Sequence, residues 1–412
     1  MSGGTVLPDA ERDARVVSPA ATTARYRIAA PTPLDTAVRA LAATVGLGPD
    51  APATVQELTP APAPAAGIEA AEVTLALPEE RLEGGVLALA EAVLDAPFDL
   101  PGLAGLRLLD VVPGAGVAAQ APGPAFGIPG TRELAGVPER PILGSIVKPS
   151  VGLSIEETAE RVRLLGVAGL DFIKDDELLA DQAHAPLAAR AEGVGAAIDE
   201  VERETGRRPM FAFNVSADDV DRMLESHDRV VEAGGTCVMV SLNQVGLAGA
   251  LALRRHTRVP IHGHRNGWGF LARSPDWGIA YPAYLALWRL VGVDHMHVNG
   301  FANKFWEPDE SVAASLRACL APMGDVPRAM PVVSSGQWGG QSVTQYAAVP
   351  SLDFMYLAGG GIQGHPDGPE AGVRAITAAW EAATAGVPLE EKAAAVPELR
   401  RSLERFGKRR AG

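Results

Sequence analysis

The second part of the chain, from Pro141 onward, alternates short apolar runs with longer segments of helical period. Eight of the apolar runs are predicted to be buried strands: "ILGSIVKPS", "LDFIKDDE", "PMFAFNVS", "TCVMVSLN", "VPIHGHR", "VDHMHVNG", "MPVVSSG" and "DFMYLAGG". Eight consecutive strand–helix units in roughly 240 residues match the size of a TIM barrel. A doubly wound open sheet is the alternative, but that fold opens on a Gly-rich first turn, which this pattern lacks.

Amphipathic segments between the strands predict the helices of the barrel. "SIEETAERVRLLGVAG" opens with Ser154 and Glu157 at the spacing of a capping box. "DDVDRMLESHDRVVEAGG" ends at Gly234 and Gly235, which are residues that terminate helices. We therefore assign residues 136–400 to a barrel domain of the α/β class.

The first part of the chain predicts a smaller domain. Residues 1–24 are polar and without period, which is typical of a disordered tail. Residues 25–135 alternate strand patterns ("ARYRIAA", "AEVTLALP", "GLRLLDVV") with helical ones, as in an α+β domain of the ferredoxin-like kind. The run "TPAPAPAAG", Thr59–Gly67, is predicted to be a loop or extended connector.

Composition narrows the class of protein. The formal net charge of the 412 residues is −14, which argues against a nucleic-acid or anionic-membrane surface. The two cysteines, Cys237 and Cys319, fit neither a disulfide framework nor a CxxC metal site and favour a reducing cytoplasm. We find no signal-peptide pattern and no apolar run of bilayer length, so we expect a cytoplasmic protein.

Polar and glycine residues follow almost every predicted strand. In a TIM barrel the carboxyl ends of the strands form the active site, although a strand end near water is often polar for no functional reason. The candidates are Lys148, Lys174, Asp176, Glu177, Asn214, His264, Arg265, His297, Ser335, Gly336, Gly359, Gly360 and Gly361. Because seven of the eight strands contribute, we interpret the set as a site.

The segment "LDFIKDDE" carries the candidate metal ligands. Lys174 and Asp176 lie on one face of the strand because side chains alternate, and Glu177 follows at its end. Two adjacent carboxylates offer the hard oxygen ligands that Mg²⁺ prefers. The pairs His262/His264 and His295/His297 leave a zinc-hydrolase barrel as an alternative. We expect the deeper His262 and His295 to be hydrogen-bonded core residues.

Two glycine-rich loops suggest an anion site. "SSGQWGGQ" and "AGGGIQGHP" follow strands seven and eight, where TIM barrels frequently bind phosphate. Arg265 could bind a second anion through two hydrogen bonds. Lys304 lies on a long loop, "NGFANKFWE", and is either a mobile functional lysine or an exposed surface residue.

The motifs together resemble those of the RuBisCO large-chain superfamily. "LDFIKDDE" is similar to the family signature GxDFxKxDE. The segments "PGPAFGIPGTRELAGVPERPILGSIVKPSVGLS", "HGHR", "VDHMHVNGFANK", "SSG" and "LAGGGIQGHP" follow in the family's order and spacing. The resemblance covers about residues 90–385 and implies a TIM barrel preceded by a smaller N-terminal domain.

The resemblance also implies roles for the candidates. Lys174 would be carbamylated by CO₂, and its carbamate with Asp176 and Glu177 would bind Mg²⁺. Lys148 resembles the acid–base lysine, His264 a residue near the reacting hydroxyls, and Lys304 the loop lysine that closes over the reaction centre. The residues implied in substrate and phosphate binding are Arg265 and His297 for one phosphate, Ser335 for a hydroxyl, and Gly336, Gly359 and Gly360 for the other phosphate.

Several positions depart from the true carboxylases. Their KPK motif is "KPS" here, which places Ser150 where they have a second lysine. Their SGG motif is "SGQ", in which Gln337 would crowd the place of a glycine, and their HRAMH motif is "HRNGWG". No Thr-Trp phosphate motif is recognisable in the first domain, and Ala96 falls near the place of its active-site asparagine. The chain therefore resembles a RuBisCO-like protein that does not fix CO₂.

The resemblance implies a Mg²⁺-dependent enzyme that forms an enediolate from a phosphorylated keto-sugar or keto-sugar acid. Decarboxylation or transcarboxylation–hydrolysis of 3-oxo-isoapionate 4-phosphate is the nearest known reaction. The alternatives are the diketo-methylthiopentyl-phosphate enolase reaction of methionine salvage and isomerisation of methylthioribulose phosphate. Two hypotheses of a different class are the zinc amidohydrolase-like barrel and a non-catalytic sugar-phosphate sensor. We expect a homodimer or higher oligomer, since family active sites are completed by a neighbouring N-terminal domain.

Overall fold

A computed structural model describes residues 19–31, 33–150 and 152–407. It divides into two compact units: one runs to Ala121 and includes Pro322–Pro327, and the other comprises Pro122–Ala321 and the chain from Arg328. The sequence pattern predicts this boundary after residue 135, whereas helix α4 (Gly127–Ala135) belongs to the larger unit. Most of the predicted tail lies outside the described residues, and its last two residues, Thr23 and Ala24, begin strand β1.

The smaller unit has the βαββαβ order of a ferredoxin-like domain. Its elements are β1 (Thr23–Pro31), α1 (Leu34–Val45), β2 (Thr54–Pro60), β3 (Ile68–Ala76), the 3₁₀ turn η2 (Glu79–Leu82), α2 (Val86–Leu94), a second 3₁₀ turn η3 (Ala96–Asp99), β4 (Gly105–Val112) and α3 (Ala115–Gln120). The four strands are antiparallel in the order β4-β1-β3-β2. Alternate residues of β1, among them Tyr26 and Ile28, are fully buried.

Strand β2 is an element that the sequence did not predict. Thr59 and Pro60, which were expected to begin a connector, are its last two residues. All seven residues of β2 are exposed, and β2 pairs with β3 at the edge of the sheet. A strand with no buried face has no alternation of hydrophobic and polar residues, so the sequence contains no pattern that predicts it.

The larger unit is a closed barrel of eight parallel strands, and all eight were predicted. They are β5 (Ile142–Ile146), β6 (Phe172–Lys174), β7 (Met210–Asn214), β8 (Cys237–Ser241), β9 (Ile261–His264), β11 (His295–Asn299), β12 (Met330–Ser334) and β13 (Met355–Leu357). Each pairs with its neighbour in chain order, and β13 pairs with β5 to close the barrel. A short strand, β10 (Trp277–Ile279), lies outside the barrel and was not predicted.

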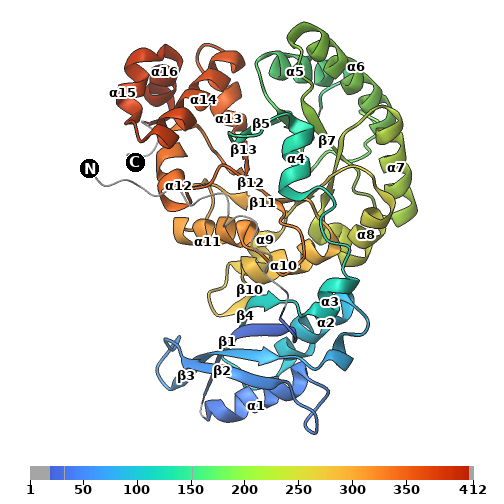
Figure 1. The fold of residues 1–412 in the computed structure, drawn as a ribbon, viewed down its shortest axis with the longest axis vertical. Helices are drawn as coiled ribbons and strands as arrows, with labels where there is room; N and C mark the ends of the chain where they lie inside the picture. The colour runs from blue at the N-terminus through green and yellow to red at the C-terminus, as the bar shows by residue number, and fades with distance from the viewer. Residues whose placement is uncertain (1–18, 32, 151, 408–412) are drawn as a thin grey trace. The chain divides into compact units, whose positions relative to one another are not determined.

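Helices surround the barrel strands (Figure 1). They are α5 (Ile155–Val167), α6 (Leu187–Thr205), α7 (Val220–Glu232), α8 (Leu242–His256), α9 (Trp268–Ala272), α10 (Tyr281–Val291), α11 (Asp309–Leu320), α12 (Ser342–Ala348), α13 (Gly359–Gln363), α14 (Pro369–Ala385), α15 (Leu389–Ala395) and α16 (Pro397–Phe406). The capping box predicted at Ser154 and Glu157 is confirmed at the start of α5.

Asp294, directly before β11, forms hydrogen bonds with chain segments that are far apart in sequence. One carboxylate oxygen accepts the backbone N–H groups of Phe126 and Gly127, and the other accepts from Arg254 and from the N–H of Ile261. The aspartate is fully buried. A buried carboxylate with four donors fixes the start of α4 against the barrel.

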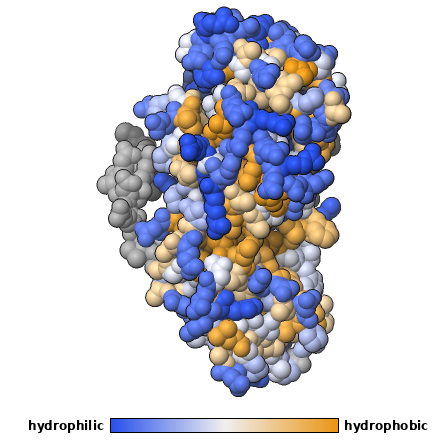
Figure 2. All heavy atoms as spheres, turned by 90° about the vertical axis from the view of Figure 1, so that its right-hand side faces the viewer, coloured by the Kyte–Doolittle hydropathy of each residue, from blue (hydrophilic) through white to orange (hydrophobic). Residues whose placement is uncertain are grey.

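Apolar side chains are largely inside the two units. The barrel interior contains Phe172, Met210, Met239, Val332 and Leu357 among its buried residues. Figure 2 shows one face of the molecule, on which hydrophilic and hydrophobic residues are interspersed. Cys237 and Cys319 are free and buried. Among the described residues, every helix is too short or too polar to cross a lipid bilayer.

Candidate active site

Lys174 is the last residue of β6, and its side chain is almost fully buried. Only 1% of it is exposed, and its Nζ donates to the backbone oxygen of Asp175 at 2.7 Å and to Glu177 Oε2 at 3.3 Å. Burial lowers the pKa of Lys174, and the nearby carboxylates of Glu177 and Asp176 offset part of that effect. The lysine is therefore shifted toward its neutral, nucleophilic amine.

Asp176 lies beside Lys148 and Ser150, which follow β5. Lys148 Nζ and Ser150 Oγ both donate to Asp176 Oδ2, the latter at 2.9 Å. The other oxygen, Oδ1, accepts the N–H of Leu178 at 3.1 Å. Burial alone would raise the pKa of Asp176, but these hydrogen bonds outweigh it and hold the pKa below its usual value. The carboxylate is thus kept ionised, as a cation ligand must be.

Glu177 and His264 complete this corner of the barrel mouth. His264 Nε2 lies 3.5 Å from Glu177 Oε2. Burial and the charge of Lys174 lower the pKa of His264 to about 4, so its imidazole is neutral near pH 7. Burial raises the pKa of Glu177, but Lys174 and His264 reverse this and the net shift is downward. Four residues predicted from sequence, Lys148, Lys174, Asp176 and Glu177, therefore converge with His264.

Asp175 points to a different partner from its two neighbours. Its Oδ2 accepts from Arg190 of α6, with 3.2 Å between Oδ2 and Nη2, and from the backbone N–H of Asn214 at 3.0 Å. The amide of Asn214 in turn donates to the backbone oxygens of Asp176 and Glu177. This buried network fixes the backbone that carries the two site carboxylates.

The donor set fits a magnesium ion and a carbamylated lysine. Asp176 and Glu177 supply two ionised carboxylates, and the amine of Lys174 lies within hydrogen-bonding distance of Glu177. Within the part of the chain that the structure describes, His227, Asp228 and His256 form the one group of three side chains close enough to share a metal. The Asp176–Glu177 pair therefore needs a further ligand, which a carbamate oxygen would supply.

A chain of histidines runs through the barrel behind this corner. His295 Nε2 lies 2.9 Å from Thr131 Oγ1, His262 Nδ1 lies 3.3 Å from His295 Nδ1, and His297 Nε2 lies 2.7 Å from His262 Nε2. His297 Nδ1 lies 3.2 Å from Ser334 Oγ. The expectation that His262 and His295 are hydrogen-bonded core residues is confirmed, since neither is exposed.

Donor and acceptor roles along this chain follow from Thr131. Its hydroxyl donates to the backbone oxygen of Gly127, so His295 Nε2–H must donate to Thr131. Burial lowers the pKa of all three histidines, and that of His295 falls to about 3. With neutral rings, His262 donates to His295 and His297 donates to His262, which leaves His297 Nδ1 as an unprotonated nitrogen 3.2 Å from Ser334 Oγ. Both ring nitrogens of His297 are therefore engaged within the protein.

Arg265 follows β9 and is held on three sides. Its guanidinium carbon lies 5.2 Å from the ring centre of Trp268 and 5.3 Å from that of Tyr281. Its Nη2 lies 3.2 Å from Glu307 Oε2, and 7% of the arginine side chain is exposed. Arg265 is thus brought near His264 and His297, since its charge contributes to lowering the pKa of both.

Lys304 lies on the exposed surface of the loop between β11 and α11. Its Nζ lies 5.2 Å from the ring centre of Phe305, and its backbone N–H donates to Ser335 O at 3.2 Å. A Cβ built on Gly336 would lie 3.5 to 3.7 Å from the Lys304 side chain. Ser335 adopts a positive φ of 77°, which is uncommon for serine, and its Oγ donates to Asn299 Oδ1 at 2.6 Å. The structure therefore pairs Lys304 with the loop after β12.

Gln337 occupies space beneath this loop. Its side chain is 1% exposed, donates to the backbone oxygen of Phe301 and accepts from the hydroxyl of Tyr356. A Cβ on Gly300 would overlap the Gln337 side chain. Gln337 therefore fills the space beneath Gly300, with its side chain directed into the core rather than toward the open side of the loop.

Gly359 and Gly360 begin helix α13, directly after β13. A Cβ built on Gly359 would lie 3.7 Å from Ile146 Cδ1, whereas one on Gly360 would meet no atom within 4 Å. The backbone at Gly360 is therefore open to a neighbouring group. Gln363, at the end of the same helix, donates to Ser145 Oγ and Ile146 O, and so ties α13 to β5.

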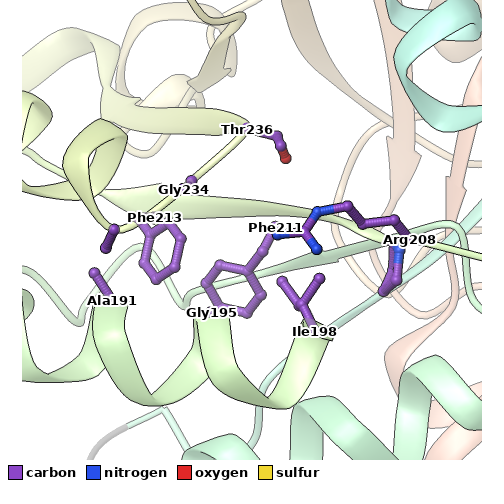
Figure 3. Close-up of a pocket in the computed structure, with 11 residues that line it drawn as sticks. Ala191, Gly195, Ile198, Arg208, Phe211, Phe213, Gly234 and Thr236 are labelled. Carbon is purple, nitrogen blue, oxygen red and sulfur yellow. The ribbon is translucent and has the colours of Figure 1, made fainter. Parts of the chain in front are cut away.

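A cavity of about 490 Å³ opens beside Glu177. Polar lining residues include Asn214, Ser216, Ser241, Gln244 and Asn266. Figure 3 shows a different pocket, where Phe211 and Phe213 of β7 face Ala191, Gly195 and Ile198 of α6. That pocket has a volume of about 10 Å³, room for one water molecule. None of the candidate site residues lines this pocket, so it is not part of the site.

Several residues of the site were not predicted. Asp175 is one of four ionisable residues in "KDDE", but the sequence gives no sign that its partner is Arg190. Glu307, which binds Arg265, lies in a loop with no periodic pattern. Trp268 lies three residues after Arg265 of the motif "HGHR", and an aromatic residue so near an arginine was the available signal. Tyr281 lies 16 positions from Arg265, and nothing in the sequence indicates its contact with the guanidinium.

Known proteins are similar to this chain over most of its length. Residues 127–406 match the family model of the ribulose bisphosphate carboxylase large chain, catalytic domain. The chain is 47% identical over 331 residues to a 3-oxo-isoapionate-4-phosphate transcarboxylase/hydrolase from Xanthobacter autotrophicus, covering 80% of both chains. It is 43% identical over 349 residues to a 3-oxo-isoapionate-4-phosphate decarboxylase from Rhizobium etli, covering 84% of both.

A solved structure shares the whole fold. The crystal structure of a rubisco-like protein from Burkholderia fungorum superposes with a TM-score of 0.90 at 39% identity, over 94% of this chain and 100% of that one. The zinc-hydrolase alternative is not supported, because His262, His295 and His297 are hydrogen-bonded to one another. By motif order, barrel architecture and similarity, the chain belongs to the ribulose bisphosphate carboxylase large-chain family.

Proposed function

We propose that this chain is a RuBisCO-like enzyme that acts on a phosphorylated 3-oxo sugar acid of the 3-oxo-isoapionate 4-phosphate type. The reaction removes the carboxyl group of the substrate, by decarboxylation or by transcarboxylation and hydrolysis. The observation that carries the proposal is the convergence of Lys174, Asp176 and Glu177 with Lys148 at the barrel mouth. The similarity to two enzymes named for this substrate supports the substrate class.

In this proposal, Lys174 carries a CO₂-derived carbamate that binds Mg²⁺ together with Asp176 and Glu177. Burial favours the neutral amine of Lys174, which is the form that reacts with CO₂. When bound, the ion would polarise the keto oxygen of the substrate. Asp175 and Arg190 hold the backbone of this segment in place.

Proton transfer is assigned to Lys148 and His264. Lys148 is half-exposed, so its ammonium can reach a bound substrate while it remains bonded to Asp176. His264 is neutral near pH 7 and can accept a hydrogen bond from a substrate hydroxyl. Lys304 is proposed to stabilise the negative charge that develops on the substrate after the loop closes over it.

The remaining candidates bind the ends of the substrate. The N–H groups of Gly336, Gly359 and Gly360 are proposed to hold the phosphate, since a Cβ at Gly360 would meet only open space. Ser335 and Arg265 are proposed to contact oxygens at the opposite end. His297 supports this end through its bonds to His262 and Ser334 rather than by donating to the ligand.

The same residues argue against CO₂ fixation. Carboxylation needs a second cation where Ser150 offers only a hydroxyl, and that hydroxyl donates to Asp176. Loss of one donor from a preorganised site typically costs about 10² to 10³ in rate. The enediolate formed by loss of a carboxyl group needs fewer contacts, which suits the residues that this chain retains.

The test is turnover of 3-oxo-isoapionate 4-phosphate with Mg²⁺ and bicarbonate. We expect release of CO₂ or of a new carboxylic acid, and loss of activity in Lys174→Ala. In parallel, ribulose bisphosphate and labelled bicarbonate should give no acid-stable label above the Lys174→Ala control. Turnover of diketo-methylthiopentyl phosphate in place of the sugar acid would transfer the assignment to the enolase reaction.

A homodimer remains our expectation for the assembly, as does a cytoplasmic location. Light scattering at micromolar concentration should give at least twice the chain mass of 42.8 kDa. A fully active monomer would contradict the shared-site expectation that the family resemblance implies.

A further inference from the structure

Glu307 was not predicted as a site residue, but its carboxylate is bonded to Arg265 and to two further side chains. Its carboxylate is 1% exposed and accepts from Arg265 Nη2 at 3.2 Å, from Asn299 Nδ2 at 2.6 Å and from Ser311 Oγ at 2.7 Å. Three donors around a buried carboxylate fix its orientation. Asn299 and Glu307 are also the two ends of the loop that carries Lys304.

This carboxylate cancels the charge of Arg265. The arginine cannot turn away, because Trp268 and Tyr281 lie against its guanidinium at 5.2 and 5.3 Å. His297, the neighbouring imidazole, is neutral and has both ring nitrogens bonded within the protein. The Arg265 end of the site therefore contains one positive and one negative charge, both buried.

One nitrogen of the Arg265 guanidinium has no partner among the described residues. Arg265 Nη1 is buried and has no hydrogen-bond partner among residues 19–31, 33–150 and 152–407. A buried N–H group without a partner costs free energy that a ligand oxygen would recover. This end of the site thus offers hydrogen bonds to a ligand without offering net positive charge.

We propose that Glu307 is a specificity-determining residue that selects substrates with one phosphate over bisphosphates. Because its carboxylate lies beside Arg265, this end of the site accepts an oxygen of an uncharged or singly charged group. This inference rests on the proposed function. A phosphate dianion placed beside Arg265 would also lie beside the Glu307 carboxylate, and a buried like-charge pair is unfavourable. The single phosphate then binds at Gly336, Gly359 and Gly360.

The first experiment compares two ligands on the Mg²⁺- and bicarbonate-treated wild-type protein. Calorimetry gives the dissociation constants of ribulose 5-phosphate and ribulose 1,5-bisphosphate. We expect the second phosphate to improve affinity by less than about tenfold, which corresponds to less than ~1.4 kcal/mol. An improvement of about 100-fold or more would overturn the inference and leave the proposed function intact. Binding of neither ligand would overturn both.

The second experiment uses Glu307→Gln, which removes the charge and keeps a side chain of the same shape. The bisphosphate should bind about tenfold or more tightly than to the wild type, while the monophosphate changes by less than about threefold. Ser311→Ala is the matched control, since it removes one hydrogen bond to Glu307 and leaves both charges. It should not change the ratio of the two dissociation constants.

A purely structural role for Glu307 predicts a different result. Glu307→Gln would then weaken both ligands together, and such a result contradicts the inference. Circular dichroism verifies that each variant is folded. If Glu307→Gln does not fold, the wild-type comparison of the two ligands decides by itself.

Discussion

Asp175 and Arg190 form an ion pair in which neither side chain is exposed to solvent, directly behind the strand end that carries Lys174 and Asp176. Replacing Arg190 by Met should lower the free energy of unfolding by about 3–5 kcal/mol, because a buried carboxylate loses its partner. The matched control is Arg208→Met, whose pairs with Asp199 and Glu202 are partly exposed and should be worth less than about 1 kcal/mol.

Chemical denaturation measures both changes. The double variant Asp175→Asn/Arg190→Met should be less destabilised than Arg190→Met, since it removes the unpaired charge. Equal losses in the Arg190 and Arg208 variants would show that burial of the first pair has no energetic consequence.

Lys174 should bind CO₂ as a carbamate, because burial favours its neutral amine and its Nζ lies close to Glu177. With Mg²⁺ and ¹³C-labelled bicarbonate, a carbamate signal should form in the wild type and be lost in Lys174→Ala. Lys392, which pairs with Glu381 on α14, is the control lysine: Lys392→Ala should retain the signal. A fully active, metal-loaded protein with an unmodified Lys174 contradicts the prediction.

Arg265→Ala and Lys304→Ala should differ in which kinetic constant they change. In the proposed function Arg265 holds a ground-state oxygen through a buried charged hydrogen bond, so its loss should raise KM by an amount equivalent to about 1.5–3 kcal/mol. Lys304 is exposed and is proposed to act after loop closure, so its loss should mainly lower kcat. Steady-state kinetics on the sugar-acid phosphate separates the two. The opposite pattern would exchange the roles assigned to the two residues.

Stability should fall when the pH drops below about 6.5. The pKa values of His262, His295 and His297 are lowered in the folded protein by burial, whereas in the unfolded chain they are near 6.5. The stability from these neutral rings is fully present above about pH 6.5 and is lost as the pH falls toward the folded pKa values. Each histidine contributes a slope of about 1.4 kcal/mol per pH unit.

Urea unfolding at pH 8, 6.5 and 5 measures this slope. His295→Gln removes one of the three rings and should give a smaller slope, although it also lowers stability at pH 8. Equal unfolding free energies at pH 8 and pH 5 in the wild type would contradict the prediction.

The barrel could be predicted because each of its strands is a buried apolar run, and polar or glycine residues follow almost all of them. The proposed metal-ligand segment could be identified because Lys174, Asp176 and Glu177 are close together in sequence, so that their convergence needs no long-range contact. Strand β2 could not be predicted, because all of its residues are exposed and its pairing with β3 determines its conformation.

The residues that hold the site residues in place could not be predicted from the sequence either. Glu307 meets Arg265 across 42 positions of the chain, and Arg190 meets Asp175 across 15. Such contacts depend on how α6 and the loop after β11 fold back onto the barrel. The direction of the Gln337 side chain could not be predicted for a related reason, because it depends on the space beneath Gly300.

The fit of Gln337 beneath Gly300 has a consequence for any attempt to restore carboxylation by reverting motif residues. Replacing Gln337 by the glycine of the carboxylases would leave an empty space under the loop and remove the partner of Phe301 O. A buried cavity and an unsatisfied carbonyl each cost about 1–3 kcal/mol or more. Reverting Gln337 alone should therefore lower stability, and a side chain at position 300 that refills the space should restore part of the loss.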